Sequence, residues 1–304
     1  AFEYKPSPHL LSSIVKYQKK KYKIEDFALE EIWQNNLRNE EFVKLNNFFW
    51  FFSLDLKSSK ETTQSIILNW INKNEKFDEN IWEFNITAKR IIAWLSNHQL
   101  TYEDSNEEYR LFFNHMLQKQ TNHLLNEIKN LDETEEKLIG CAAIILTGLA
   151  YNDEKNYLDN GLNILKNLIK HSLDKQGFPK SRNIQNLVFY LKYLIIIREW
   201  FKESQNPIPE YVDETIYYLG SSYAFIWQNI KQDIFFNGNY SSNHHEFDQY
   251  LKRFGYTFKN QINELAGYTI LQNKKFILAA DIGSNPEKIF TKNYQAGALS
   301  FEIF

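Results

Sequence analysis

Arg182 and Asn183 have side chains that could do chemistry together, because they stand at the predicted start of a helix over residues 183–204. A guanidinium, an amide and the backbone N–H groups of a helix N-terminus can together hold a carboxylate. The alternative is that Asn183 only caps the helix, since asparagine is a favoured N-cap residue. The sequence leaves both interpretations open.

Arg90 and Trp94 form a second candidate pair. They are four residues apart, so a helix places them on one face, together with Glu83. Such a face could present a guanidinium to a carboxylate and an indole to a sugar ring. The alternative is structural: the indole packs in the core, and the guanidinium pairs with Glu83 or with a neighbouring helix.

His244 and His245, followed by Glu246 and Asp248, suggest a metal site at first sight. Adjacent histidines on a loop are poor co-ligands without further partners, so we predict a solvated loop and no bound metal. His244 remains a candidate for contacting a bound ligand from this loop. Asn237, in the run FFNGN, is a second candidate.

These side chains depend on a largely helical chain, since apolar residues recur at intervals of three and four from about residue 8 to 232. Glycines and prolines mark the breaks, for example in DKQGFPKS and SQNPIPEY. The pattern predicts about ten helices. Their approximate spans are 8–20, 25–37, 39–53, 60–73, 79–97, 105–130, 134–151, 155–173, 183–204 and 208–232.

Short connections make consecutive helices antiparallel neighbours, which stack as a solenoid or close into an α/α toroid. The absence of a fixed-period repeat favours an α/α toroid, an incomplete barrel of helical hairpins, over residues 1–232. Residues 233–264 are predicted to be an irregular connecting loop. Three runs rich in β-branched and aromatic residues then predict the first strands of an antiparallel β-sandwich domain over 265–304, truncated at the chain end. The first two runs form a hairpin, and the third pairs nearby.

Composition excludes some classes of protein. The formal net charge is -3, so there is no general basic excess for binding nucleic acid. The basic run at 19–23 is interpreted as a solvated helix end. The one cysteine excludes an intrachain disulfide and a cysteine-based zinc site. The apolar run around it, about 14 residues, is too short to cross a bilayer, so we predict no transmembrane segment.

Three stretches resemble heparinase II/III family proteins. GYTILQNKKFILAADIG followed by QAGALSFEIF resembles the strand pair and His-Ala-(Asp or Gly)-x-Leu-Ser-Phe-Glu segment of that family. WEFNITAKRIIAWLSNH resembles its W-x(n)-A-x-R-x-x-x-W helix, and GFPKSRN resembles its turn before a long helix. The resemblance implies a polysaccharide lyase that performs β-elimination on a uronic-acid-containing polysaccharide and needs no cofactor.

The resemblance also implies roles for individual residues. Gln295 stands where the family has a catalytic histidine, and an amide cannot exchange a proton near neutral pH. Asn183, Arg182, Arg90 and Gln295 would neutralise the uronate carboxylate. Tyr190 or Tyr193 would act as base, although neither lies clearly on the family's S-P-x-Y-H pattern. The expected substrate contacts come from Arg90, Trp94, Arg182, Tyr193, Asn237 and His244.

Two functional hypotheses follow. The first is a lyase that binds an acidic polysaccharide between toroid and β domain. The second is a non-catalytic glycan-binding or envelope polysaccharide assembly protein on the same scaffold, favoured by Gln295 and by the lack of a clear Tyr-His pair. The resemblance implies the periplasm or cell envelope. No signal peptide is visible, but the chain begins with alanine and stops in mid-pattern, so we interpret it as cropped and leave the cytoplasm open. The sequence does not define the oligomeric state.

Overall fold

The structure is a computed structural model of the 304-residue chain. It describes residues 2–12, 14, 23–26, 40–151, 156–232, 234, 236, 244–260, 262–291, 294 and 299–304.

The chain divides into two compact units, which are described separately. The first unit comprises residues 1–165 and 199–206, and the second comprises 166–198 and 207–304. Two long helices, α9 (Tyr157–Ser172) and α10 (Ile184–Glu203), therefore contribute to both units. The predicted domain boundaries near 232 and 265 stay predictions.

The first unit is helical in all of its longer described elements. Two caps show why its helices begin where they do: the Ser59 side chain accepts a hydrogen bond from the Thr62 N–H at 3.1 Å, and Asn106 accepts one from Tyr109 at 2.8 Å. Its α-helices are α1 (His9–Ser12), α3 (Glu40–Asn46), α4 (Lys60–Asn74), α5 (Phe84–Ser96), α6 (His98–Thr101), α7 (Glu107–Glu127) and α8 (Thr134–Ala150). Short 3₁₀ helices cover Ile24–Asp26, Phe49–Ser53 and Ile128–Asn130.

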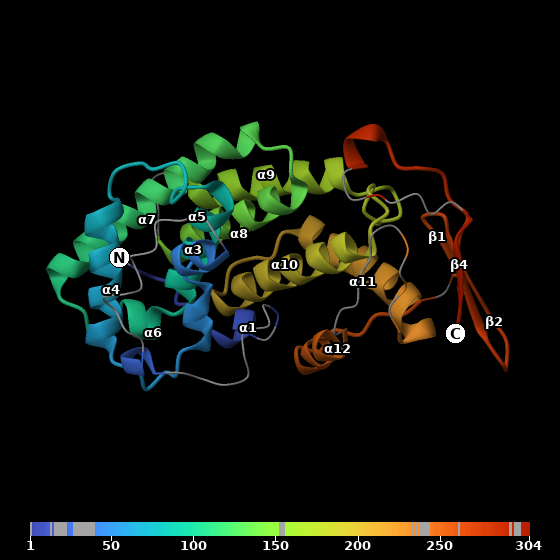
Figure 1. The fold of residues 1–304 in the computed structure, drawn as a ribbon, viewed down its shortest axis with the longest axis horizontal. Helices are drawn as coiled ribbons and strands as arrows, with labels where there is room; N and C mark the ends of the chain where they lie inside the picture. The colour runs from blue at the N-terminus through green and yellow to red at the C-terminus, as the bar shows by residue number, and fades with distance from the viewer. Residues whose placement is uncertain are drawn as a thin grey trace. The chain divides into compact units, whose positions relative to one another are not determined.

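Helix α5 is the centre of the first unit's core. It packs against α7 and α8 (Figure 1), and most of its side chains are buried, including Ile91, Ile92 and Leu95. A helix that is buried on most of its sides must be enclosed by other elements. Because α5 is buried in this way, its predicted sugar-binding face is enclosed by the protein.

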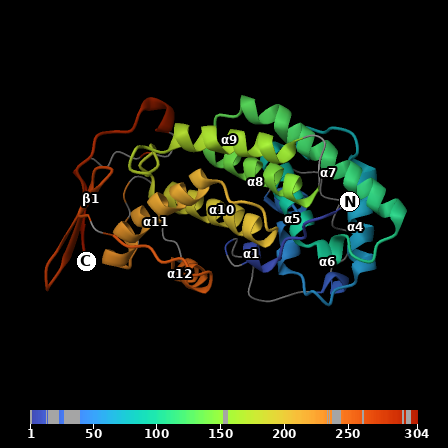
Figure 2. The same cartoon turned by 180° about the vertical axis from the view of Figure 1, so that it is seen from behind.

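The second unit combines helices with a small sheet. The part of α10 that belongs to this unit lies beside α11 (Glu210–Ile230) in both views (Figure 1 and Figure 2). Helix α12 (His244–Arg253) follows, and then a 3₁₀ helix at Lys288–Phe290 interrupts the strand region. The strands are β1 (Glu264–Leu265), β2 (Tyr268–Gln272), β3 (Ile277–Asp281) and β4 (Phe301–Ile303).

The four strands form one antiparallel sheet in the order β1-β2-β3-β4. Strands β2 and β3 form the predicted hairpin, with Ile270 opposite Ala279. Strand β4 pairs with β3, with Glu302 opposite Ala279. The three predicted strand runs are therefore confirmed, and β1 is an addition to them.

The described helices confirm most of the predicted spans between 60 and 232. The predicted helix at 25–37 lies almost entirely outside the described residues. The expectation of an irregular loop over 233–264 is corrected by α12, which occupies His244–Arg253. Phe247, Tyr250 and Leu251 are buried at the i, i+3, i+4 spacing of an amphipathic helix, a short period that the polar residues around it obscured.

Within the part of the chain that the structure describes, no helix combines the length and apolar character needed to span a membrane.

Candidate functional site

The turn before α10 is built by local side-chain hydrogen bonds. Asp174 Oδ1 accepts from the N–H groups of Gln176 at 2.8 Å and Phe178 at 2.9 Å. The backbone of Leu173 bridges to Pro179. Aspartate favours such turns because its side chain can bond backbone groups a few residues further on. The sequence DKQGFPKS therefore folds back on itself and fixes where the next two residues, Arg182 and Asn183, lie.

Arg182 ends this turn and binds the sheet. It has a left-handed backbone (φ 57°), and its guanidinium donates to Ala266 O and Ser284 O, both at 2.9 Å, and to Asp281 Oδ1 at 2.5 Å. The Asp281 carboxylate is fully buried, and Tyr268 OH donates back to Arg182 O at 2.5 Å. Every nitrogen of the guanidinium is thus engaged within the protein. The geometry gives Arg182 a structural role, and we do not include it among the groups that hold a substrate.

Asn183 caps α10. Its Oδ1 accepts from the N–H groups of Gln185 at 2.7 Å and Asn186 at 3.2 Å, and the side chain is buried. This is the capping alternative that the sequence left open, and such a cap stabilises a helix by about 1 kcal/mol. Its catalytic role stays a prediction.

The two predicted bases on α10 are both buried: Tyr190 is 1% exposed and Tyr193 is 7% exposed. Burial raises the pKa of Tyr193, because the phenolate form is poorly solvated inside the protein. A catalytic base must come within hydrogen-bond distance of the proton that it removes. The placement of both side chains therefore favours packing over proton transfer, so we look for a base elsewhere.

Arg90 and Trp94 are both fully buried in α5. The guanidinium donates to Gln120 Oε1 at 2.6 Å and to Asn46 O at 2.8 Å, and it lies over the Trp70 ring at 4.1 Å from the ring centroid. The surroundings favour the structural alternative for this pair. The guanidinium contacts two neighbouring helices, α3 through Asn46 and α7 through Gln120, as one form of that alternative predicted, and both partners are uncharged.

The side chains of three predicted site residues are not described by the structure. Gln295 and Asn237 lie outside the described residues. His244 is the first residue of α12, and its side chain is not described. The neighbouring His245 is exposed on the first turn of α12.

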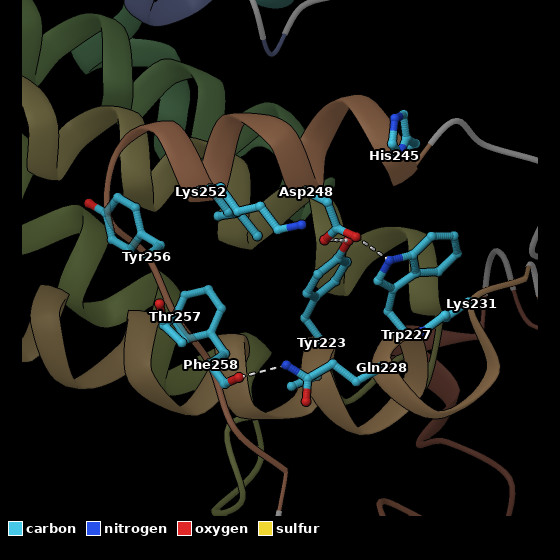
Figure 3. Close-up of a pocket in the computed structure, with 12 residues that line it drawn as sticks. Tyr223, Trp227, Gln228, Lys231, His245, Asp248, Lys252, Tyr256, Thr257 and Phe258 are labelled. Carbon is cyan, nitrogen blue, oxygen red and sulfur yellow. Dashed lines mark hydrogen bonds between the residues drawn. The ribbon is translucent and has the colours of Figure 1, made fainter.

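A pocket of about 590 Å³ lies between α11 and α12 and is closed on one side by residues 256–258. We call it the α11–α12 pocket. Figure 3 shows Asp248 between Tyr223 and Trp227, with His245 on the first turn of α12. This volume is in the range of pockets that hold small ligands, so one or two sugar rings would fit.

Asp248 organises the pocket. Its Oδ1 accepts from Tyr223 OH at 2.9 Å, and its Oδ2 accepts from Trp227 Nε1 at 2.5 Å. Burial raises the pKa of Tyr223, and the negative charge of Asp248 and the hydrogen bond to it raise the pKa further. Tyr223 therefore stays protonated at neutral pH, and the carboxylate holds both rings in fixed orientations.

The exposed side chains that line the pocket include two cations, Lys231 and Lys252, and one imidazole, His245. Gln228 and Thr257 are the neutral exposed side chains of the lining. Gln249 Nε2 lies 3.0 Å from His245 Nε2. An amide nitrogen donates, so this contact is a hydrogen bond in the tautomer whose Nε2 is unprotonated. The pocket thus offers aromatic side chains for a sugar ring, lysines for an anionic group and an imidazole.

The spacing of three pocket residues in the sequence could have indicated this pocket. Tyr223 and Trp227 are four residues apart on one face of a predicted helix, and Asp248 follows the histidine pair. Recognising the helix at 244–253 would have placed Asp248 one turn after the histidines.

Among the described residues, no three His, Cys, Asp or Glu side chains gather closely enough to hold a metal ion.

The helical part followed by the antiparallel sheet defines a class: the chain has the heparinase-like polysaccharide lyase fold. It is similar to a mutant form of the heparan sulfate lyase HepC from Pedobacter heparinus, with a TM-score of 0.68, 12% identity, and coverage of 90% of this chain and 49% of that one. It is also similar to heparinase III (TM-score 0.62, 15% identity, 95% and 50% coverage). A heparinase III gene product gives a TM-score of 0.62 at 15% identity, with 97% and 59% coverage.

These likenesses confirm the predicted fold, and at such identities they show the fold alone. The chain spans about half the length of the first two lyases, 49% and 50%. No protein-family model matches the sequence, and comparison with curated proteins gives no match.

Proposed function

We propose that this chain binds a uronic-acid-containing polysaccharide and cleaves it by β-elimination. The observation that carries the proposal is the fold: 90% of the chain superposes on a heparan sulfate lyase with a TM-score of 0.68. Heparan sulfate is an acidic polysaccharide, and the α11–α12 pocket offers aromatic and cationic groups suited to an acidic sugar. By the same resemblance we place the protein in the periplasm or cell envelope.

The reaction requires that the C5 proton of a uronate be made acidic. In the proposed mechanism, cations hold the carboxylate next to C5, so that negative charge can develop there. Lys231 and Lys252 are placed to supply this charge, and Gln295 remains a candidate hydrogen-bond donor. A base removes the C5 proton, a double bond forms between C4 and C5, the C4–O bond breaks, and the leaving oxygen takes a proton.

We assign the base to His245. Its imidazole is exposed at the pocket, and imidazole is the side chain most often used as a general base. Tyr190 and Tyr193 are buried, which disfavours them. A substrate would replace the Gln249 amide as the hydrogen-bond partner of Nε2, so the same nitrogen could accept the C5 proton.

A non-catalytic glycan-binding protein is the second candidate function. It is favoured by Gln295, which stands at the position of the histidine in the family motif and cannot transfer a proton. The same pocket would then hold an acidic glycan without cleaving it.

A cleavage assay separates the two candidates. The unsaturated uronate made by β-elimination absorbs ultraviolet light, so its appearance is specific to this reaction. We expect wild-type activity on at least one uronate polysaccharide and a loss of about 100-fold or more in His245→Ala, the usual contribution of general base catalysis. His115→Ala is a matched control, since His115 is also exposed but lies in the first unit. Glycan binding without any product would favour the second candidate.

A further inference from the structure

A second pocket lies on the second unit, next to the α11–α12 pocket. It has a volume of about 650 Å³ and shares Thr257 and Phe258 with its neighbour. Two adjacent tyrosines of α11, Tyr217 and Tyr218, lie in its wall, so we call it the tyrosine pocket. The segment that contains residues 257 and 258 is thus a common wall between the two.

The two tyrosines are exposed and adjacent to each other. Tyr217 is 65% exposed and Tyr218 is 42% exposed, and their rings meet edge to face with centroids 5.5 Å apart. Leaving two large aromatic rings in water forgoes the free energy that burial would supply. Sugar rings carry C–H faces that stack on aromatic side chains, so exposed rings of this kind suit a glycan.

The pocket's walls are built by close backbone approaches. A Cβ on Gly177 would lie 2.3 Å from Tyr218 Cβ, and a Cβ on Gly220 would lie 2.1 Å from the Phe258 ring. Gln228 Nε2 also donates to Phe258 O at 2.7 Å. Glycine at these two positions therefore lets the 174–177 turn and the 256–258 segment pack directly on α11.

The charge of the tyrosine pocket is positive. Lys175 and Lys259 line it and are exposed, and none of the described residues that line it is acidic. Two ammonium groups beside a pair of aromatic rings match a sugar that carries a carboxylate or sulfate. A neutral glycan would use the rings but not the lysines.

We propose that the tyrosine pocket is a second subsite, which binds an acidic sugar of a chain whose neighbouring sugars occupy the α11–α12 pocket. Tyr217 and Tyr218 stack on the sugar, and Lys175 and Lys259 bind its anionic groups. This inference rests on the proposed function only in taking an acidic polysaccharide as the ligand. It requires no cleavage.

Calorimetric titration with heparan sulfate oligosaccharides of two lengths, a disaccharide and a decasaccharide, tests the proposal. The α11–α12 pocket has room for one or two sugar rings, so only the longer ligand should occupy both pockets. We expect Tyr217→Ala to weaken decasaccharide binding about 10-fold, as for the loss of one stacking contact, and to change disaccharide binding less than about 2-fold. Tyr217→Phe should keep the wild-type affinity, because it keeps the ring.

Two controls address folding and charge. Phe112→Ala removes another exposed aromatic side chain, 46% exposed in the first unit, and should leave both affinities unchanged. Replacing Lys175 and Lys259 together by glutamate should weaken decasaccharide binding and reduce its salt dependence.

The outcomes are distinguishable. If the wild type binds neither heparan sulfate oligosaccharides nor other uronate glycans, the proposed function and this inference are both overturned. If the wild type binds the decasaccharide and Tyr217→Ala binds it equally well, the second subsite alone is overturned. Equal weakening for both ligand lengths would also overturn it, because the tyrosines would then belong to the principal site.

Discussion

Asp248 is the residue on which the geometry of the α11–α12 pocket depends. One carboxylate accepts from both Tyr223 and Trp227, so a single side chain orients two rings from another helix. Asp248 acts through these two neighbours, and its effect is visible in the titration of Tyr223.

Asp248→Asn should lower the pKa of Tyr223. The negative charge and hydrogen bond of Asp248 contribute to the raised pKa, while the larger contribution, burial, remains in the variant. The pKa should therefore fall but stay above the usual value of about 10. NMR of protein labelled with ¹³C-tyrosine measures it directly.

Asp213→Asn is the matched control for that titration. Asp213 pairs with Arg198 at 2.5 Å, away from Tyr223, and should leave its titration unchanged. The expected stability losses also differ: about 1 to 3 kcal/mol for Asp248→Asn, where two donors lose a charged acceptor, against less than about 1 kcal/mol for the exposed pair. Equal tyrosine titrations in wild type and Asp248→Asn would contradict the assigned hydrogen bond.

For individual residues, the sequence indicated which side chains can bind sugars or carboxylates, but it did not indicate what those side chains contact in the folded chain. Arg90, Trp94, Arg182 and Asn183 were singled out because their side chains can bind sugars and carboxylates. The structure shows those same capacities used inside the protein, in hydrogen bonds, ring stacking and a helix cap. The chemistry of a side chain does not say whether its partner is a ligand or its own chain, because that depends on burial.

At the scale of elements, Arg182 joins the turn before α10 to the sheet. Its three hydrogen-bonded nitrogens reach residues 266, 281 and 284, which lie in β3 and in the segments next to β2 and β3. The Asp281 carboxylate is fully buried and pairs with this guanidinium, and its Oδ1 also accepts from Gly283 N–H at 3.1 Å. These hydrogen bonds connect the start of α10 to the sheet within one unit.

Arg182→Ala should lower the free energy of unfolding by about 3 to 5 kcal/mol, because it leaves a buried carboxylate without its cation. Adding Asp281→Ala should recover part of the loss, since the unpaired charge is then removed. Arg198→Ala, which breaks an exposed ion pair, should cost less than about 1 kcal/mol. Chemical denaturation measures all three variants. Additive losses in the double variant would contradict the coupling.

Helices and strands were predictable where local pattern determines them. The helices from α4 to α11 and the β2–β3 hairpin follow the apolar period and the Gly, Pro and Asn breaks. Helix α12 was missed because its three buried positions stand among seven polar or charged neighbours, and only packing against the protein selects its apolar face. That miss also hid the pocket, since α12 supplies Asp248 and His245.

At the scale of the whole molecule, buried tyrosines make stability depend on alkaline pH. Their pKa values are raised, above all by burial. The unfolded chain releases these protons near pH 10, while the folded chain retains them. Stability is therefore fully present below about pH 10 and is lost as the pH rises further. The tyrosines concerned are Tyr4, Tyr109, Tyr151, Tyr193 and Tyr223.

Urea unfolding between about pH 8 and pH 11 measures this effect. Each tyrosine contributes a fall of up to about 1.4 kcal/mol per pH unit above pH 10, and Lys89, whose pKa burial lowers, acts in the opposite direction. Tyr193→Phe should reduce the slope by one such contribution. A stability that stays level through pH 11 would show that these phenols are not buried as described.

The fold class was predictable at this scale, and the activity was not. The run of helices followed by strands, with the motifs near residues 90, 182 and 300, was enough to predict a heparinase-like fold. Catalysis depends on which side chains line a pocket together, and these come from elements far apart in sequence. Tyr223 and Asp248, for example, meet only because α11 and α12 pack together.

The ultraviolet assay for unsaturated uronate decides whether this chain is a lyase, when it is run on a panel of uronate polysaccharides with wild type, His245→Ala and Gln295→His. We expect product from the wild type, loss of product in His245→Ala, and equal or greater activity in Gln295→His. A wild type that binds the glycans but yields no unsaturated product with any of them would contradict β-elimination by this chain.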